Sequence, residues 1–413
     1  MLKGKDKKPK ISLFGHFGGG NFGNESTLQA MLCHIRRTLP DAEITCICTA
    51  PEFVAANYKI AASPMTWVVV KSWNLHSPLA RFARKMFIGI PSEVYRWLVG
   101  IKILWDKDAL IVVGTGLMTD AFRLDGWGPY GTFKWSMIAK LSRCRLLFVS
   151  VGAGPLSDGL ARFLATSALS LADFRSYRDE STLQYLRDIG FRSNGDQVYP
   201  DLAFSLPAAV LPNGHTQNGR RLVVGLGLMD HVGMYGKVNA TSADYSAYVE
   251  TLAAFVKWLL DREYDVRLLI GDRNDMPILR EFRAVLKGRL SMDEDRRITD
   301  KPAQSVEDLL SQLAETDLVV GTRFHNVLLA LLLNKPTISI SFHHKCSSLM
   351  SQMGLSEYCQ DIKQLNADKL IEQFCQLEKN SESLRQMIRE RVADCRKALD
   401  EQYSIIFKDL LLG

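Results

Sequence analysis

Three side chains that suit the chemistry of a small anion lie close together in the sequence. Arg323 and His325 come shortly after an apolar run at residues 318–320, and Lys345 lies beyond the next apolar run. An arginine guanidinium can hold a carboxylate or phosphate through two parallel hydrogen bonds. A histidine gains or loses a proton near neutral pH. From these residue types, Arg323 and His325 are the candidate catalytic pair.

The surrounding pattern places these side chains where a strand ends and a helix begins. Residues 318–320 are apolar and mostly β-branched, whereas residues 324–333 repeat apolar side chains with helical spacing. In an open α/β sheet such strand ends face the ligand, and free N–H groups at a helix start favour an anion. Gly321 and Thr322, which join the two elements, are predicted to bind the charged substrate together with Arg323.

The next strand and helix are expected to bring Lys345 to the same edge of the sheet. Residues 337–341 form the predicted strand, and Lys345 stands where the following helix opens. Two adjacent strand ends would then present Arg323, His325 and Lys345 to one crevice. The alternative is that Arg323 pairs with a surface carboxylate and His325 caps a helix.

Glycine-rich turns follow several predicted strands and indicate the floor of a crevice. Glycine lets the backbone approach a ligand closely and adopt positive φ, although tight turns need glycine in any case. After the first strand, Asn24 is the expected N-cap of the next helix. The residues expected to line the cleft are Gly18, Gly20, Asn21, Gly23, Gly114, Gly116, Gly152, Gly154 and Arg273.

Strands that alternate with amphipathic helices predict two parallel-sheet domains. The 413 residues exceed one typical domain. Residues 1–205 are the expected N-terminal Rossmann-like domain, residues 206–219 a polar linker, and residues 220–375 a second Rossmann-like domain. Residues 376–413 are helical, charged and amphipathic.

Motifs at both ends of the chain resemble those of the polysaccharide pyruvyl transferase family. Residues 314–345 resemble its C-terminal signature, in which an Arg-x-His strand end is followed by a lysine at the next strand end. Phe324 stands where the family usually has a smaller aliphatic residue. The N-terminal glycine turn resembles the family's as well, with Asn24 in place of the common aspartate.

Three further segments extend the resemblance through the first half of the chain. The turn at residues 114–116 has Thr115 in place of a family glycine, and residues 178–181 resemble an Arg-Asp-Glu element. Residues 198–204 resemble the Pro-Asp segment with which the family leaves its first domain. By this resemblance Arg178 is a candidate for binding the donor, unless it pairs with a nearby carboxylate.

The resemblance implies a GT-B-like fold of two doubly wound Rossmann-like domains facing a central cleft, with the last helix crossing back to the first domain. It also implies transfer of a pyruvyl group from phosphoenolpyruvate to a sugar of a cell-surface polysaccharide or its lipid-linked precursor, forming a ketal. The second domain would bind the donor and the first the acceptor. Arg323 would hold the carboxylate or phosphate, Lys345 would neutralise the leaving phosphate, and His325 would protonate the enol carbon.

Two other functions are compatible with the same residues. A GT-B nucleotide-sugar glycosyltransferase would use the basic side chains for a diphosphate, and it would bind a nucleotide diphosphate but not phosphoenolpyruvate. A non-catalytic assembly factor would keep the fold without turnover. The intact set of Arg323, His325 and Lys345 argues mildly against that loss of activity.

The composition limits partners and compartment. Hydrophobic residues make up 47% and charged residues 23%, and the net charge of +6 is modest, so no nucleic acid partner is expected. The eight cysteines include no CxxC pair, and no acidic cluster has metal-ligand spacing, so neither a metal nor a resident cofactor is expected. With no evident signal peptide or bilayer-spanning run, the expected location is the cytoplasm.

One helical segment, residues 73–105, is rich in both aromatic and basic side chains. Such a segment can lie on a membrane interface, which would place the protein at the inner face of the cell membrane. The alternative, which we weight more heavily, is a helix pair that packs on the sheet and extends its cations to water.

Overall fold

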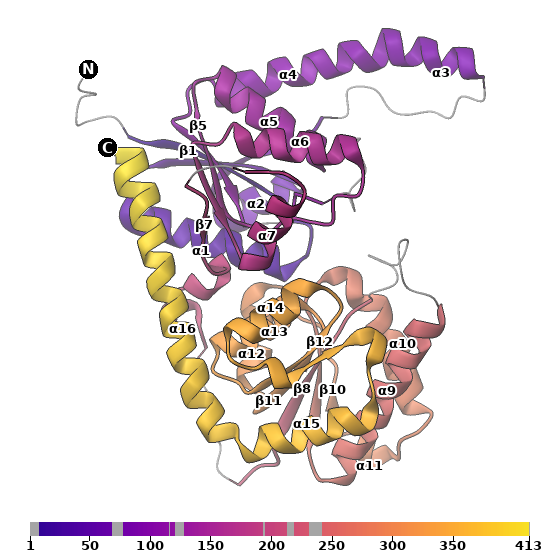
Figure 1. The fold of residues 1–413 in the computed structure, drawn as a ribbon. Helices are drawn as coiled ribbons and strands as arrows, with labels where there is room; N and C mark the ends of the chain where they lie inside the picture. Colours follow the sequence, from indigo (N-terminus) through magenta and orange to yellow (C-terminus); the bar gives the residue numbers. More distant parts are fainter. Residues whose placement is uncertain are drawn as a thin grey trace. The chain divides into compact units, whose positions relative to one another are not determined.

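The computed structural model describes residues 8–67, 77–114, 116–119, 128–192, 195–212, 219–230 and 242–412. Within them the chain divides into two compact units (Figure 1). Unit 1 comprises the described residues within Met1–Gly19, His34–Tyr199 and Tyr403–Gly413, and unit 2 comprises those within Gly20–Cys33 and Pro200–Gln402. Residues 20–33, which the sequence-based boundaries placed in the first domain, therefore group with the second unit. Residues 213–218 of the expected linker lie outside the described residues.

Unit 1 is built on a seven-stranded parallel sheet in the order β3-β2-β1-β4-β5-β6-β7. Its central strand β4 is buried at every position, as expected for a parallel sheet that is covered on both faces. The strands are β1 (Lys10–Gly15), β2 (Glu43–Cys48), β3 (Ala61–Pro64), β4 (Ala109–Val113), β5 (Arg145–Val151), β6 (Phe174–Tyr177) and β7 (Gln197–Val198).

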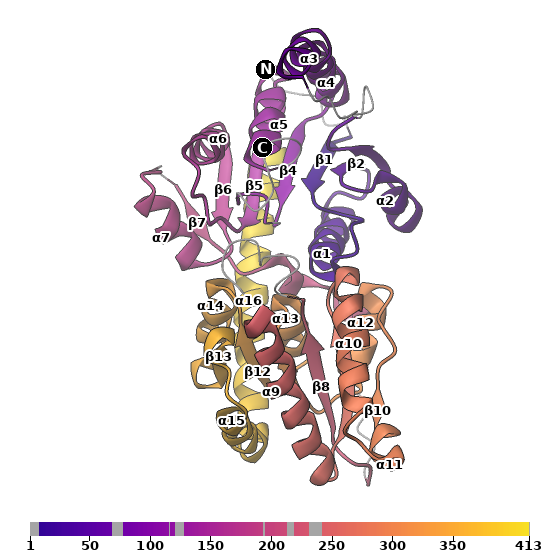
Figure 2. The ribbon, with the colours of Figure 1, turned by 90° about the vertical axis from the view of Figure 1, so that its right-hand side faces the viewer.

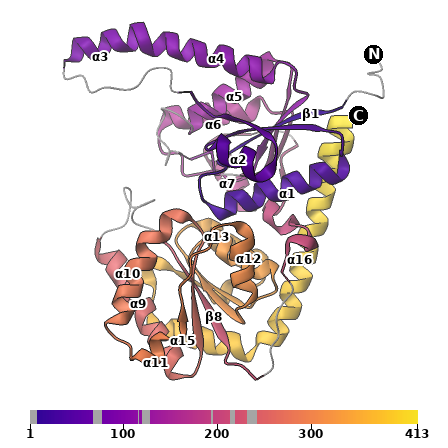
Figure 3. The ribbon, with the colours of Figure 1, turned by 180° about the vertical axis from the view of Figure 1, so that it is seen from behind.

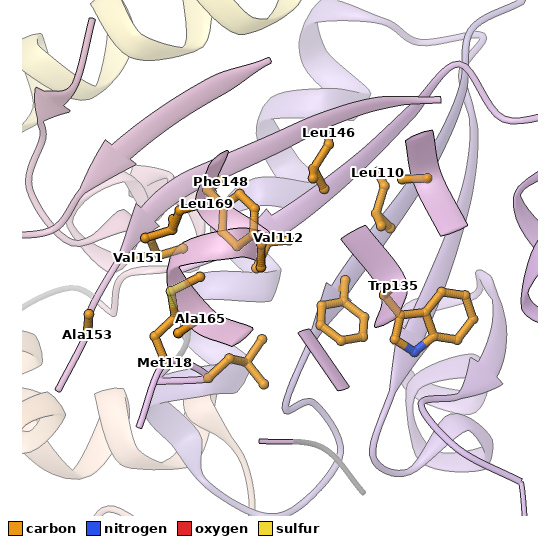
Figure 4. Close-up of a cluster of buried hydrophobic side chains, with 14 of the residues drawn as sticks. Leu110, Val112, Met118, Trp135, Leu146, Phe148, Val151, Ala153, Ala165 and Leu169 are labelled. Atoms are coloured by element: carbon orange, nitrogen blue, oxygen red, sulfur yellow. The ribbon is translucent and has the colours of Figure 1, made fainter. Parts of the chain in front are cut away.

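Helices of unit 1 cover this sheet and enclose an apolar core. Trp135 of α5 belongs to the same buried apolar cluster as Leu110 of β4 and Phe148 of β5 (Figure 4), and its indole N–H donates to the Met65 carbonyl over 3.0 Å. The helical segments are α1 (Phe22–Thr38, which begins in unit 2), α2 (Pro51–Tyr58), α3 (Pro78–Arg84), the π-helix η1 (Lys85–Gly89), α4 (Ile90–Leu104), α5 (Pro129–Leu141), α6 (Gly159–Ser170) and α7 (Glu180–Asp188).

Unit 2 repeats this plan with a six-stranded parallel sheet in the order β10-β9-β8-β11-β12-β13. In both sheets the strand order reverses beside the first strand, between β1 and β4 and between β8 and β11. This reversal is the position where open α/β sheets bind ligands. The strands are β8 (Val223–Leu228), β9 (Asp265–Ile270), β10 (Ile298–Thr299), β11 (Leu318–Gly321), β12 (Thr337–Ser341) and β13 (Cys359–Asp361).

Helices alternate with these strands along the chain, as parallel strands require. The segments are η2 (Leu202–Ser205), η3 (Ala208–Val210), α9 (Ser242–Asp261), η4 (Arg273–Asp275), α10 (Met276–Lys287), α11 (Met292–Asp295), α12 (Val306–Ala314), α13 (Phe324–Leu332), α14 (His344–Gln352), η5 (Ser356–Tyr358), η6 (Ile362–Gln364), α15 (Ala367–Lys379) and α16 (Ser381–Ser404). A π-helix, η7 (Ile405–Leu412), continues α16. Two all-parallel sheets with intervening helices confirm the predicted pair of Rossmann-like domains.

The end of α16 belongs to unit 1, where the Tyr403 ring stacks on His34 with centroids 4.0 Å apart. None of the helices within the described residues combines the length and the apolar character that a bilayer-spanning segment needs.

Candidate functional site

The turn from β11 to α13 carries the two predicted catalytic side chains. β11 pairs with β8 on one side and β12 on the other, so its carboxyl end lies at the reversal of strand order in unit 2. The glycines of the adjacent strand ends clear space for this turn, because a Cβ at Gly227 or Gly271 would lie 2.8 or 2.3 Å from the Asn326 side chain. The carboxyl ends of β8, β9 and β11 therefore lie close together.

Arg323 lies in a buried ion network. Its Nε and Nη2 donate to the two carboxylate oxygens of Asp275 over 2.7 and 2.6 Å, and Nη2 lies 3.9 Å from Asp272. Burial raises the pKa of the Asp275 carboxyl, and its hydrogen bonds to Arg323 oppose that rise. In this structure, the two guanidinium nitrogens that were expected to hold a substrate anion bind the Asp275 carboxylate. The sequence-based alternative allowed a carboxylate partner at the surface, but Asp275 is buried.

His325 has a carboxylate partner, Asp201. In the sequence, Asp201 was recognised only as part of the Pro-Asp segment at residues 198–204, and it was not predicted as a site residue. The imidazole Nε2 lies 3.7 Å from the Asp201 Oδ2, an ion pair when the ring is protonated. Asp201 is 3% exposed, and its Oδ1 accepts the Ala203 N–H at the start of η2 over 3.0 Å. This N-cap contact orients the carboxylate. A Pro-Asp pair directly before an apolar segment was the signal in the sequence that could have pointed to it.

Gly23 packs against the other side of the same imidazole. A Cβ at Gly23 would lie 1.8 Å from His325 Nδ1, far inside van der Waals contact. Only glycine therefore lets the start of α1 approach this ring. Gly23 and Asp201, from distant parts of the sequence, together determine where the imidazole lies.

Asn21 joins the start of α1 to the β9 turn. Its Oδ1 accepts the N–H groups of Gly23 and Asn24 over 3.1 Å each, so Asn21 caps the helix and the expected cap at Asn24 was wrong. Its Nδ2 donates to Asp272 Oδ2 over 2.9 Å, which places the glycine turn against the Arg323 network.

Backbone hydrogen bonds hold the same two turns together. Phe22 N–H donates to the Gly271 carbonyl over 3.1 Å, and Arg273 N–H donates to the Gly20 carbonyl over 3.0 Å. Gly20 has a φ of +87°. The Arg273 side chain packs over Gly20, and its Nη2 donates to the Gln304 carbonyl over 2.8 Å.

Lys345 presents its ammonium group over two aromatic rings. Nζ lies 5.7 Å from the Phe324 centroid and 5.1 Å from the Phe342 centroid, distances typical of cation–π contacts. In the part of the chain that the structure describes, no carboxylate forms an ion pair with it. Phe324, larger than the usual family residue, thus supports the lysine. Thr322 accepts or donates a 2.8 Å hydrogen bond with the buried Tyr248 hydroxyl.

The remaining predicted residues lie in unit 1, at the carboxyl ends of its strands. Gly152 allows close approach of Arg178, because a Cβ there would lie 2.5 Å from Nη2. Arg178 Nε lies 3.5 Å from the Asp179 carboxylate. Burial raises the pKa of the Asp179 carboxyl. The positive charge of Arg178 and the N–H and O–H groups of α7 lower it by a larger amount, so the pKa lies below its ordinary value. The other residues of this set are Gly18, Gly114, Gly116 and Gly154.

Arg178 therefore follows the alternative that the sequence allowed for it, an ion pair with a neighbouring carboxylate. Gly18 and Gly154 have φ of +81° and +96°, where glycine is favoured. A Cβ at Gly116 would meet no atom within 4 Å. Among the residues described, no group of three or more His, Cys, Asp or Glu side chains could hold a metal ion.

The arrangement in unit 2 suits acid catalysis on an anion. His325 is oriented by a buried carboxylate on one side and a glycine on the other, and its side chain remains 16% exposed. An imidazole held by a carboxylate is a recurrent general acid–base unit. Lys345 supplies a positive charge at the neighbouring strand end.

Known proteins are similar to this chain in sequence or in fold. The Amylovoran biosynthesis protein AmsJ of Erwinia amylovora is 20% identical over 408 residues, covering 92% of this chain and 94% of that protein. The UDP-GlcNAc 2-epimerase of Neisseria meningitidis, solved with UDP-GlcNAc, has a TM-score of 0.57 at 11% identity over 98% of this chain and 100% of that chain. Anabaena HepE, solved with UDP, has a TM-score of 0.57 at 10% identity, covering 96% and 99%.

At these identities the solved structures establish the fold alone, and they confirm that it is GT-B-like. The family model for polysaccharide pyruvyl transferase matches residues 21–344, a range that includes Asn21, Gly23, Asp201, Arg323 and His325. The chain belongs to the polysaccharide pyruvyl transferase family.

Proposed function

We propose that this transferase moves a pyruvyl group from phosphoenolpyruvate to a sugar of a polysaccharide or its lipid-linked precursor, forming a ketal. The observation that supports it most is the His325 imidazole, held between Asp201 and Gly23 at the carboxyl edge of unit 2. Family membership and the likeness to an amylovoran biosynthesis protein support a role in polysaccharide modification.

The reaction needs one proton on carbon and the loss of one phosphate. Protonation of the enol carbon by the His325 imidazolium gives oxocarbenium character at the carbon that bears the phosphate. One sugar hydroxyl adds there, and its proton returns to the His325 imidazole. Phosphate then leaves as the second hydroxyl adds to the same carbon. The proton of that hydroxyl leaves with the phosphate, which completes the ketal. Such proton transfer contributes about two to four orders of magnitude in rate.

Each remaining group has a role that its position supports. Lys345 carries the positive charge that a leaving phosphate requires. Arg323 is a positioning residue in this proposal, because its paired hydrogen bonds to Asp275 join the turn before α13 to the turn after β9. The N–H groups at the start of α13 add favourable electrostatics for an anion.

Calorimetric titration with phosphoenolpyruvate, beside UDP and GDP, tests the donor. We expect phosphoenolpyruvate to bind the wild type, to bind His325→Asn with similar affinity, and to bind Lys345→Met more weakly. His325→Asn should lower phosphate release in the presence of an acceptor polysaccharide by at least about 100-fold.

The outcomes separate the proposed activity from its rivals. Binding of UDP or GDP without phosphoenolpyruvate would assign the protein to nucleotide-sugar chemistry on the same fold. Turnover that is unchanged in His325→Asn would remove the histidine from the mechanism. Lys363→Met, which changes an exposed lysine in η6, is the matched control for Lys345→Met.

A further inference from the structure

A helical segment of unit 1 exposes an unusual amount of apolar surface. We define the helical arm as residues 78–105, which comprise α3, η1, α4 and Trp105. Figures 1 and 3 show α3, η1 and α4 as one continuous rod whose α3 end extends past α5, and Figure 2 shows the rod nearly end-on. None of the residues of η1 is buried. The exposed large apolar side chains are Leu79, Phe82, Met86, Phe87, Ile90, Val94, Tyr95, Leu98 and Trp105.

Five of these apolar side chains share one face of the rod. Phe82, Met86, Ile90, Val94 and Leu98 follow a strict spacing of four residues, which drifts slowly around an α-helix of 3.6 residues per turn. The π-helix η1 holds more residues per turn, so it offsets that drift. The result is a continuous apolar stripe along the arm.

The opposite face of α4 is anchored to the body of unit 1. Glu93 accepts hydrogen bonds from the Tyr130 hydroxyl, over 2.7 Å, and from Lys134, over 3.1 Å. Gly100 lets α4 approach α5, since a Cβ there would lie 2.7 Å from the Ile138 side chain. The stripe is therefore held outward by packing on the other side of the helix.

The charge of the arm identifies what the stripe fits. The arm contains five basic side chains (Arg81, Arg84, Lys85, Arg96 and Lys102) and one acidic side chain, Glu93, which gives a net charge of +4. Glu93 is already engaged by Arg96, 2.8 Å away, and Lys134. Within the described residues, no carboxylate forms an ion pair with Arg81 or Lys85. A second copy of the arm would bring like charges together, whereas an anionic lipid surface complements them.

We propose that the helical arm lies on an anionic membrane surface, with its apolar stripe in the interfacial region and with Arg81 and Lys85 among the headgroups. Exposed Tyr95 and Trp105 suit this location, because tyrosine and tryptophan favour the membrane–water interface. An amphipathic helix with aromatic and basic side chains has this mode of binding, which spans no bilayer. The proposal is independent of the reaction that the enzyme catalyses.

Flotation of the full-length protein with lipid vesicles tests the proposal. We expect binding to vesicles that contain phosphatidylglycerol and weaker binding to phosphatidylcholine alone. Arg81→Gln combined with Lys85→Gln should lower binding to the anionic vesicles about 25-fold, from about fivefold per basic residue. Phe82→Ser and Phe87→Ser should each lower it by about tenfold.

A matched pair of methionine substitutions controls for general surface effects. Met86→Ser removes an arm side chain that is 45% exposed, and Met292→Ser removes one in unit 2 that is 78% exposed. Only Met86→Ser should weaken vesicle binding. Because the substituted side chains are exposed, thermal unfolding should stay close to that of the wild type, and the glutamine variant gives a second measurement if a serine variant does not fold.

The proposal would be overturned by a wild type that does not float with anionic vesicles, or by arm variants that float as the wild type does. Sedimentation without lipid gives a further test. A dimer that the Phe82→Ser/Phe87→Ser variant dissociates would assign the stripe to a second copy of this chain.

Discussion

Gly23→Ala should disable His325 without touching a polar group. The added Cβ would lie 1.8 Å from Nδ1, 2.2 Å from Cγ and 2.3 Å from Cε1 of the imidazole. Non-bonded carbon atoms approach to about 3.5 Å, so the ring must move by roughly 1.5 Å. A displacement of that size would separate Nε2 from Asp201, now 3.7 Å away, and would cost on the order of 100-fold in turnover.

The assay for Gly23→Ala combines turnover with equilibrium unfolding. Alanine is about 1 kcal/mol better than glycine inside a helix, so a loss of stability in this variant would report the collision. In a His325→Ala background the collision partner is gone, and the same substitution should then be neutral or stabilising. The two substitutions should therefore couple by about 0.5–3 kcal/mol.

Gly19→Ala is the matched control, because a Cβ at Gly19 meets no atom within 4 Å. It should leave both turnover and stability near the wild-type values. Additive effects of Gly23→Ala and His325→Ala on the free energy of unfolding, together with unchanged turnover in Gly23→Ala, would refute the reasoning.

Three further predictions concern charged or titrating side chains. Arg323→Ala should lower the free energy of unfolding by about 3–5 kcal/mol, since it leaves the buried Asp275 carboxylate without its partner; a loss of phosphoenolpyruvate affinity without a loss of stability in urea titration would assign Arg323 to the substrate instead. Lys345→Met should weaken phosphoenolpyruvate binding, while its urea unfolding midpoint should match that of Lys363→Met. Equal phosphoenolpyruvate affinities in the two variants would contradict the role of Lys345. Burial lowers the pKa of His16 to about 3. Below pH 6.5 the unfolded chain therefore binds a proton at His16, whereas the folded chain does not. The free energy of unfolding should fall by about 2 kcal/mol between pH 6.5 and 5. His16→Gln should flatten that decline in unfolding measured across pH, and an unchanged slope would show that other groups cause it.

Local signals in the sequence were enough to predict the strand ends. Apolar β-branched runs followed by glycine predicted β4 and β11, and both form as buried parallel strands. The motif with Arg323 and His325 was correctly placed at the junction of β11 and α13, because strand and helix periodicity change there within a few residues.

Partners across the sequence could not be predicted in the same way. The carboxylate beside Arg323 comes from the β9 turn, and the one beside His325 comes from Asp201. Each pairing depends on which strand ends become neighbours in the sheet, and periodicity carries no information on strand order. The glycine turn at residues 20–24 was predicted to line a cleft, but its contact with the imidazole depends on a helix start meeting another turn.

The amino-acid sequence by itself determined the two Rossmann-like sheets, the positions of their glycine turns and the family to which the chain belongs, because these follow from local periodicity and short motifs. The tertiary structure alone decided that Arg323 pairs with Asp275, that Asp201 and Gly23 hold His325, and that Asn21 rather than Asn24 caps α1. It also decided that the apolar stripe of residues 78–105 faces outward. Side-chain partners are chosen by contacts between segments far apart in the chain, and those contacts exist only once the sheets have formed.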